Sequence, residues 1–346
     1  MKKIILLFLI VLIAGLFITS RKINRGQLSS KTGIPPTTYD LPTTTLFFAG
    51  DIMLSRNVAA KIYAADDYTL PFKNVASESQ AADIAFANLE SPFNDTGDRS
   101  VEGSLVFNAD PRSVAGLKFA GFDILSTANN HSMDQGSIGL IETQNVLTTV
   151  GILPVGTGND CREGKIITRN NITFGFLAYS YTAYNTGGSD SPYPQVCDAN
   201  DLQGLKKDIQ NLRPSVDVLV VSTHMGTEYT RNPNASQINF AHTAIDAGAD
   251  LIIGNHPHWV QTIEQYNGKW IFYALGNFVF DQMWSTETRE GLTATVTFKD
   301  KTLDKIVLKP VIIDNFCCPR WADELESEAI LSKISLNSPI LFNAGD

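Results

Sequence analysis

Short apolar runs rich in β-forming residues recur along the chain, and each is followed by turn residues. Runs of this length, bounded by Gly, Asp or Asn, predict buried strands. The runs that bear on function are 46–49, 84–87, 122–125, 218–221 and 250–253.

Between several of these runs lie stretches with the apolar spacing of a helix. They cover 110–120, 137–148, 202–212 and 237–247. Alternating strands and helices predict an α/β domain, in which ligands gather beyond the carboxyl ends of the strands. We therefore expect the side chains that directly follow these strands to lie together.

The segment Gly254–His258 places two imidazoles two residues apart, in a Gly-led turn directly after the run 250–253. Imidazole is the commonest protein ligand of borderline transition metals, so the pair indicates a metal site. Taken alone, the pair could equally be two polar loop residues. Other ligand-type side chains also follow strands and favour the metal site. The full set is Asp51, Glu90, Asn130, His131, His224, His256 and His258.

These residues stand in motifs that resemble those of the CapA proteins, the capsule or poly-γ-glutamate synthesis proteins, which are similar to calcineurin-like metallophosphoesterases. The resemblance runs from about Thr43 to Ile313 and implies a sandwich of two β-sheets flanked by helices, with a metal centre at the sheet edge. The motifs are Gly50-Asp51-Ile52-Met53 with Arg56, Asn88-Leu89-Glu90, Asn129-Asn130-His131 with Asp134 and Gly136, His224-x-Gly226-x-Glu228-Tyr229, Gly254-x-His256-Pro257-His258, and Leu275-Gly276-Asn277-Phe278 with Asp281-Gln282.

The resemblance also implies which residues hold metal. Asp51 and His258 would hold one ion, and Glu90 would bridge it to a second. The second ion would be held by Asn130, His224 and His256. This donor set suits Mn²⁺, Zn²⁺ or Fe²⁺, as one or two ions. Two such ions can activate a bridging water and clamp both oxygens of an in-line displacement.

Other residues qualify this picture. His131, beside Asn130 at the second ion, would act as the acid that protonates a leaving group. Met53 stands where the phosphoesterases place a histidine, and Glu90 where they usually have Asp. Because a thioether is a poor ligand for a hard divalent ion, we expect a weaker first site and little ordinary phosphatase activity. Arg56 either binds a phosphate or carboxylate bidentately or only balances charge. His242 has helical spacing to apolar neighbours and reads as structural.

The amino terminus predicts an export signal or an anchor. Residues 1–20 hold an apolar stretch flanked by basic residues, and we favour an uncleaved single-pass membrane anchor with the domain outside the cytoplasm. Residues 21–42 read as a flexible linker and 43–313 as the metallophosphoesterase-like domain. Residues 314–346 form a tail that we expect to pack on the domain as a short helix.

The cysteines allow a disulfide if the domain is exported. We expect a bond between Cys161 and Cys197, although three connectivities are open. Cys317 and Cys318 are adjacent and could pair only with strain. Four free buried thiols are the alternative in a reducing compartment.

The net charge of the chain limits the classes of molecule that it is expected to bind. The net charge is −9 and the sequence pI about 5.1, without a basic stripe, which disfavours nucleic acid. A polyanionic substrate would have to be held by local groups such as Arg56 or by the metals.

Three functions fit. The first is a membrane-anchored protein of polymer synthesis or export that handles a chain such as poly-γ-glutamate, with membrane subunits of a polymer synthase as possible partners. The second is a metal-dependent phosphoesterase acting on an exported small phosphate ester. The third is a non-catalytic binding scaffold. Fold alone does not distinguish them, because one fold hosts many functions.

Overall fold

The structure is a computed structural model, and it describes residues 42–181 and 195–334. The predicted membrane anchor and nearly all of the linker lie outside the described residues. Within the described part of the chain, no helix has the length and apolar character needed to cross a membrane.

The first sheet has eight strands, and its central strands are parallel. In spatial order they are β16 (Cys318–Trp321), β15 (Thr302–Asp314), β14 (Glu290–Lys299), β1 (Thr43–Ile52), β2 (Ile84–Leu89), β3 (Ile124–Ser126) and β4 (Leu153–Val155), with β13 (Asn277–Val279) beside β1. β1 is parallel to β2 and β13 and antiparallel to β14.

The second sheet has six strands. In spatial order they are β11 (Ile263–Tyr266), β12 (Lys269–Phe272), β10 (Leu251–Asn255), β9 (Val218–His224), β7 (Ile172–Ser180) and β6 (Lys165–Arg169). β9 is parallel to both β10 and β7. A small third pairing joins β5 (Thr157–Gly158) to β8 (Gln195–Val196).

Both faces of the central strands are buried, which explains their nearly continuous apolar sequence. Along β1, Phe48 faces the core between the two sheets, whereas Phe47 faces a second core on the outer side of the first sheet. Phe86 of β2 stacks on Phe176 of β7 across the sheets, with ring centroids 5.9 Å apart. Full burial of each such ring contributes about 1.5–3 kcal/mol, so the inter-sheet core fixes how the two sheets face each other.

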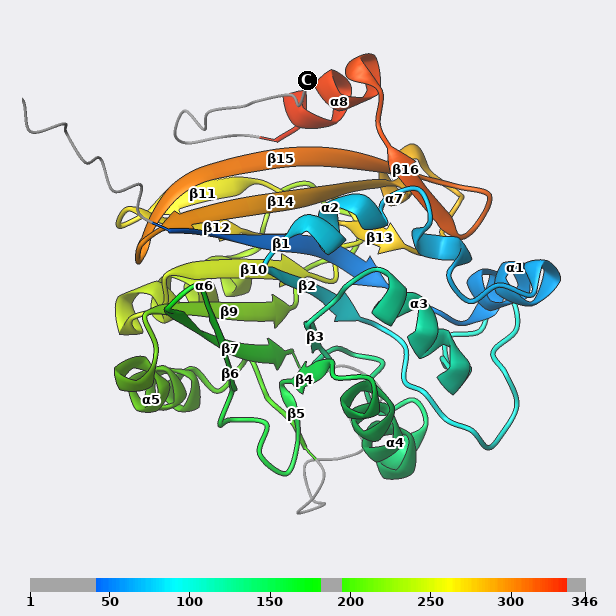
Figure 1. The fold of residues 1–346 in the computed structure, drawn as a ribbon, viewed down its shortest axis with the longest axis horizontal. Helices are drawn as coiled ribbons and strands as arrows, with labels where there is room; N and C mark the ends of the chain where they lie inside the picture. Colours follow the sequence, from blue (N-terminus) through cyan, green and yellow to red (C-terminus); the bar gives the residue numbers. More distant parts are fainter. Residues whose placement is uncertain (1–41, 182–194, 335–346) are drawn as a thin grey trace, which may run out of the picture. The chain divides into compact units, whose positions relative to one another are not determined.

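Helices cover the outer faces of both sheets (Figure 1). Those on the first sheet are α1 (Arg56–Ala65), α2 (Ala76–Ala81), α3 (Val114–Phe119) and α4 (Gly136–Thr149). Those on the second sheet are α5 (Leu202–Leu212) and α6 (Ala235–Ala247). α7 (Thr286–Arg289) precedes β14, and α8 (Glu324–Ser332) packs on β15. The expected α/β class, with two sheets flanked by helices, is confirmed.

Some sequence-based boundaries were wrong. The expected helix 110–120 is a 3₁₀ turn, Pro111–Ser113, followed by α3. Gly254 does not lead a turn, because β10 continues through Asn255. A Cβ atom on Gly254 would lie 2.0 Å from the carbonyl oxygen of Tyr273, so close backbone approach requires this glycine.

The four cysteines form two disulfide bonds. Cys161 and Cys197 are bonded as expected, with Cα atoms 5.7 Å apart. Cys317 and Cys318 are bonded to each other as well. Cys317 lies in the turn after β15 and Cys318 begins β16, and the two residues before them, Asn315 and Phe316, both have positive φ angles. The structure therefore shows one of the three connectivities that the sequence left open.

Candidate metal centre

Parallel strands from both sheets end at one edge of the domain, where the arrowheads of β1, β2 and β9 point in Figure 1. Asp51 lies near the end of β1, and Glu90 directly follows β2. From the second sheet, His224 ends β9 and His256 directly follows β10. All four are buried. The sheet edge thus gathers the residues as the strand pattern predicted.

Asp51, Glu90 and His258 form one group of potential metal ligands, with one donor atom of each within 4.8 Å of the others. Nδ1 of His258 lies 2.9 Å from Oδ1 of Asn277. Its Nε2 lies 3.9 Å from Oε1 of Glu90. Because Asn277 engages Nδ1, Nε2 is the atom of His258 available to an ion.

Glu90, His224 and His256 form a second group. Nε2 of His224 lies 3.6 Å from Oε1 of Glu90, 3.2 Å from Nδ1 of His256 and 2.8 Å from Oδ1 of Asn130. Around an ion with bonds of about 2.1 Å, neighbouring ligand atoms lie roughly 3.0–3.4 Å apart. Glu90, His256 and Asn130 each place a donor atom within a few tenths of an ångström of this range from Nε2 of His224, and Asn130 lies where the resemblance implies.

Glu90 belongs to both groups, and its surroundings fit a metal. It is fully buried, and neither carboxylate oxygen has a hydrogen-bond partner among the described residues. A buried carboxylate without a partner costs several kcal/mol unless it is protonated or bound to a cation. Burial, and next the charge of Asp51, raise the pKa of Glu90 well above its usual range. A cation between the two groups would satisfy both oxygens.

Burial also sets the protonation of the other ligands. It lowers the pKa of His224 and His256 well below the usual value and that of His258 to about 4. These imidazoles are therefore neutral near pH 7, which is the form that binds metal. Burial raises the pKa of Asp51 to about 7, against hydrogen bonds from Asn88 and the backbone of His256.

Several orienting residues were missed or left without a role. The Tyr181 hydroxyl lies 2.9 Å from Nε2 of His256, which leaves Nδ1 facing His224. Asn88 donates from Nδ2 to Asp51 at 2.8 Å. Such contacts fix the ring orientation and tautomer of metal ligands. Tyr181 follows β7 between Ser180 and Thr182, in a polar stretch that belongs to none of the motifs, so the sequence offered no signal for it.

The backbone at the two imidazoles is unusual. His256 has φ of 100° and His258 has φ of 57°, a region that residues with a Cβ atom seldom adopt. Such conformations cost about 1–3 kcal/mol each and persist where the surrounding structure imposes them, often at functional sites. The turn after β10 thus adopts a costly backbone conformation that directs both rings toward Glu90.

His131 lies beside the centre rather than in either ligand group. Its Nδ1 atom lies 2.7 Å from Oδ2 of Asp134, and its Nε2 lies 3.9 Å from Oε1 of Glu90. Phe107 stacks on the ring at 3.8 Å. Asp134 also accepts a hydrogen bond from the backbone N–H of Phe107. The Asp134 contact points Nε2 of His131 toward the centre, as proton donation requires.

Met53 is fully buried, and its sulfur is engaged locally. Ser55 donates to this sulfur from its backbone N–H at 3.1 Å and from its hydroxyl at 3.0 Å. The described contacts therefore direct the thioether to Ser55. The first group retains three protein donors, compared with four in the second.

The remaining predicted residues divide between the centre and the periphery. Arg56 forms a buried ion pair with Asp281 and donates to the carbonyl oxygen of Ser104 at 3.1 Å. Glu228 is exposed, and its charge raises the pKa of Glu90. His242 lies on α6, with Nε2 3.1 Å from Oε1 of Glu264 in β11, and belongs to neither ligand group, in agreement with its structural interpretation.

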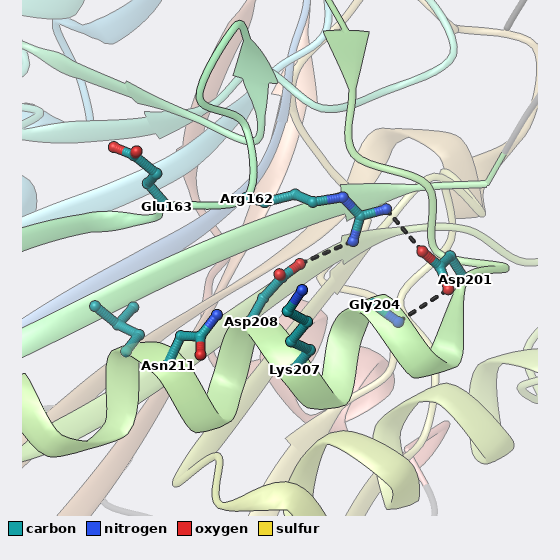
Figure 2. A pocket seen from close by; sticks show the side chains of 8 residues that line it. Arg162, Glu163, Asp201, Gly204, Lys207, Asp208 and Asn211 are labelled. Carbon is teal, nitrogen blue, oxygen red and sulfur yellow. Dashed lines mark hydrogen bonds and ion pairs between the residues drawn. The ribbon is translucent and has the colours of Figure 1, made fainter.

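A separate groove of about 570 Å³ runs along α5 (Figure 2). Arg162 bridges Asp201 and Asp208 there, at 2.8 and 2.9 Å. Asp201 also caps α5 by accepting from the N–H of Gly204, and Asp208 accepts from the hydroxyl of Tyr179. These groups satisfy one another, and no predicted site residue lines the groove. We therefore place the site at the sheet edge.

Comparison with known proteins matches residues 45–282 to a family model described as bacterial capsule synthesis protein PGA_cap. The PGA biosynthesis protein CapA of Bacillus subtilis is 30% identical over 315 residues, covering 89% of this chain and 82% of that protein. The capsule biosynthesis protein CapA of Bacillus anthracis is 31% identical over 270 residues, covering 74% of this chain and 64% of that protein.

Solved structures give more distant matches. An NAD nucleotidase of Haemophilus influenzae aligns with a TM-score of 0.49 and 11% identity, covering 86% of this chain and 64% of that one. A putative 5′-nucleotidase of Staphylococcus aureus aligns with a TM-score of 0.46 and 13% identity, covering 84% and 58%.

Proposed function

Because this chain belongs to the bacterial capsule synthesis protein family PGA_cap, we propose that it serves the synthesis or export of a polymer such as poly-γ-glutamate through a metal-dependent centre at Glu90. The resemblance to CapA proteins drawn from the motifs is confirmed. The relatives' names link them to capsule and PGA biosynthesis, and this role is carried over here as part of the proposal.

One observation carries the proposed centre: Glu90 is shared by two groups of buried ligands and has no hydrogen-bond partner of its own among the described residues. Divalent ions held there would polarise a carbonyl or phosphoryl oxygen and lower the pKa of a bound water. Asp51 and His258 would hold one ion. His224, His256 and Asn130 would hold the other, with Mn²⁺, Zn²⁺ or Fe²⁺ suited to the donors.

The chain's own residues supply the rest of the proposed chemistry. His131 would hold a proton on Nε2 and deliver it to a leaving group, while Asp134 keeps Nδ1 engaged. Phe107 covers one face of the ring and restricts water there. This arrangement suits the splitting or transfer of a polymer bond whose leaving atom needs a proton.

A second candidate is a metal-dependent phosphoesterase acting on an exported phosphate ester. The His131–Asp134 contact favours it, because protonation of an alcohol leaving group needs such an oriented acid. The engagement of Met53 by Ser55 weighs against efficient phosphatase activity. We therefore rank polymer processing first.

The proposal includes location. We propose that residues 1–20 anchor the chain in the membrane with its domain outside the cytoplasm, near membrane subunits of a polymer synthase. The apolar amino-terminal sequence and the Cys161–Cys197 bond support this, because disulfides persist in oxidising compartments. Protease added to spheroplasts should digest the domain, and the intact chain should stay with membranes in high salt. Protection of the domain would overturn this topology.

The function can be tested by complementation in a polymer-producing host that lacks its own copy. The wild-type chain should restore surface polymer carrying free carboxylates, and Glu90→Gln should not. Glu264→Gln is the matched control, because Glu264 binds His242 and Tyr273 away from the centre. Equal restoration by wild type and Glu90→Gln, both present at the same level in membranes, would favour a binding scaffold over a metal-dependent centre.

A further inference from the structure

Arg56 lies against the metal centre through two aromatic rings. Its guanidinium carbon is 4.8 Å from the centre of the Phe107 ring and 5.6 Å from that of Phe280. Phe107 stacks on His131, and Phe280 packs against His258 with centroids 4.9 Å apart. The cation is thus separated by single rings from the predicted proton donor and from a predicted metal ligand.

The guanidinium of Arg56 is held in place, but not all of its N–H donors are engaged. It has five N–H groups, and the described contacts engage one nitrogen with Asp281 and another with the carbonyl of Ser104. Nε is buried and has no partner among the described residues. The side chain is only 10% exposed, which limits it to one orientation. The terminal nitrogens Nη1 and Nη2 each carry a second N–H beyond these contacts, and a rigid fork with such spare donors is suited to binding a carboxylate.

The backbone also indicates a constrained position. Arg56 starts α1 with φ of 49°, a left-handed conformation costly for a residue with a side chain. Asp281 also accepts from the N–H of Asn57, so one carboxylate fixes both the guanidinium and the first turn of α1. The local structure over-determines where Arg56 points.

The surroundings of the centre are negatively charged, and the guanidinium of Arg56 offsets part of this charge. The chain carries a net charge of −9, and Asp51, Glu228 and Asp134 all add negative potential at Glu90. Arg56 acts in the opposite direction and lowers the pKa of both Glu90 and His258. An anionic polymer approaching this edge therefore meets repulsion that Arg56 counteracts.

We propose that Arg56 is the specificity-determining residue of the centre and binds a free carboxylate of the polymer beside the bond held at Glu90. Every residue of a γ-linked glutamate chain carries such an α-carboxylate. This inference rests on the proposed function, which supplies the polymer. Arg56 selects a substrate with a carboxylate next to the reacting bond, and Asp281 positions Arg56 without contacting the substrate.

The test measures the affinity of two proteins, wild type and Arg56→Ala, for two ligands. It uses the full-length chain in detergent with Mn²⁺. The ligands are a γ-linked oligoglutamate and the same oligomer with its α-carboxylates converted to carboxamides. Charge-assisted hydrogen bonds predict that Arg56→Ala weakens binding of the acid oligomer by about tenfold or more. The amide oligomer should bind wild type weakly and should distinguish the two proteins less than about twofold.

Lys61→Ala is the matched control, because Lys61 lies on the same helix and its removal changes the net charge equally. It binds Asn315 at the surface, so its loss should change Kd by less than about twofold. Arg56→Lys retains the charge without the fork and should still lose several-fold in affinity. Metal content and thermal unfolding, measured for every variant, establish that the centre and the fold persist.

The outcomes separate this inference from the proposed function. If wild type binds the acid oligomer and both folded, metal-loaded Arg56 variants bind it equally well, the role of Arg56 is wrong and the proposed function stands. If wild type with bound metal ignores both oligomers but binds an aryl phosphate in an Arg56-dependent way, the polymer assignment fails and the oxyanion belongs to a phosphate ester. Equal affinity of wild type for the acid and amide oligomers would contradict carboxylate recognition directly.

Discussion

Nε2 of His224 lies 3.6 Å from a carboxylate oxygen of Glu90, although the two residues come from different sheets. His224 ends β9 in the second sheet, and Glu90 follows β2 in the first. Their approach depends on the core between the sheets, where Phe86 and Phe176 stack. The centre is therefore a product of sheet packing, and changes in that core should be felt as changes in metal affinity.

Met53→His should strengthen the first site. Provided that the backbone aims the new side chain at the site, an imidazole would add a nitrogen donor to Asp51, Glu90 and His258, which supply three protein donors. We expect higher metal occupancy or faster hydrolysis of an aryl phosphate, which wild type should hydrolyse slowly or not at all. Metal content and phosphatase rate test this. Ser55→Ala is the control, because it removes the hydroxyl donor to the sulfur without adding a nitrogen ligand. Fast phosphatase turnover by wild type would contradict the claim that Met53 limits hydrolysis at this site.

His131→Ala should suppress activity without removing metal. His131 lies outside both ligand groups, and loss of a general acid lowers rates by roughly 10²–10⁴-fold. Asp134→Asn should give a smaller loss, because it disturbs the orientation of the ring only. Rates measured alongside metal content separate the two effects. Unchanged turnover in His131→Ala would remove this residue from the mechanism.

The sequence reveals the site residues that a strand positions locally, but it does not reveal those that only the packing of the two sheets brings in. Asp51, His224 and His256 follow apolar runs of the sequence, so the alternation of strand and helix was enough to bring them together. Their division into two groups came from the family resemblance. Tyr181 reaches His256 only through the docking of the sheets, and nothing in the local sequence encodes that contact. β14 and β15 went unpredicted, because their alternating polar and apolar residues carry no functional motif.

Metal binding should release protons and strengthen as pH rises through about 7. Asp51 has its pKa raised to about 7 in the metal-free protein, and that of Glu90 is also raised. A raised folded-state pKa stabilises the fold below the ordinary value of 3.8, and this contribution is lost as pH rises through about 7. The thermal shift on adding Mn²⁺ should therefore be larger at pH 8 than at pH 5.5, and calorimetry in two buffers should detect the released protons. Equal shifts at both pH values would contradict these protonation states.

The two disulfides should differ in their contribution to stability. The Cys161–Cys197 bond spans 36 residues, and loop closure predicts a stabilisation of about 3–4 kcal/mol. The Cys317–Cys318 bond closes no chain loop and should contribute less than ~1 kcal/mol by this mechanism. Denaturant unfolding of the two double Cys→Ser variants provides the comparison. Equal losses would show that loop entropy is not the dominant effect.

The central claim is that Glu90 joins two metal sites, and metal stoichiometry tests it most directly. After saturation with Mn²⁺ and gel filtration, elemental analysis of the full-length wild type should give about one to two ions per chain. Glu90→Gln should lose nearly all bound metal, because both groups lose a ligand. His256→Ala should lose the second site and His258→Ala the first, whereas His242→Ala should match wild type. A wild type that binds no metal, or a Glu90→Gln variant that retains all of it, would contradict the account.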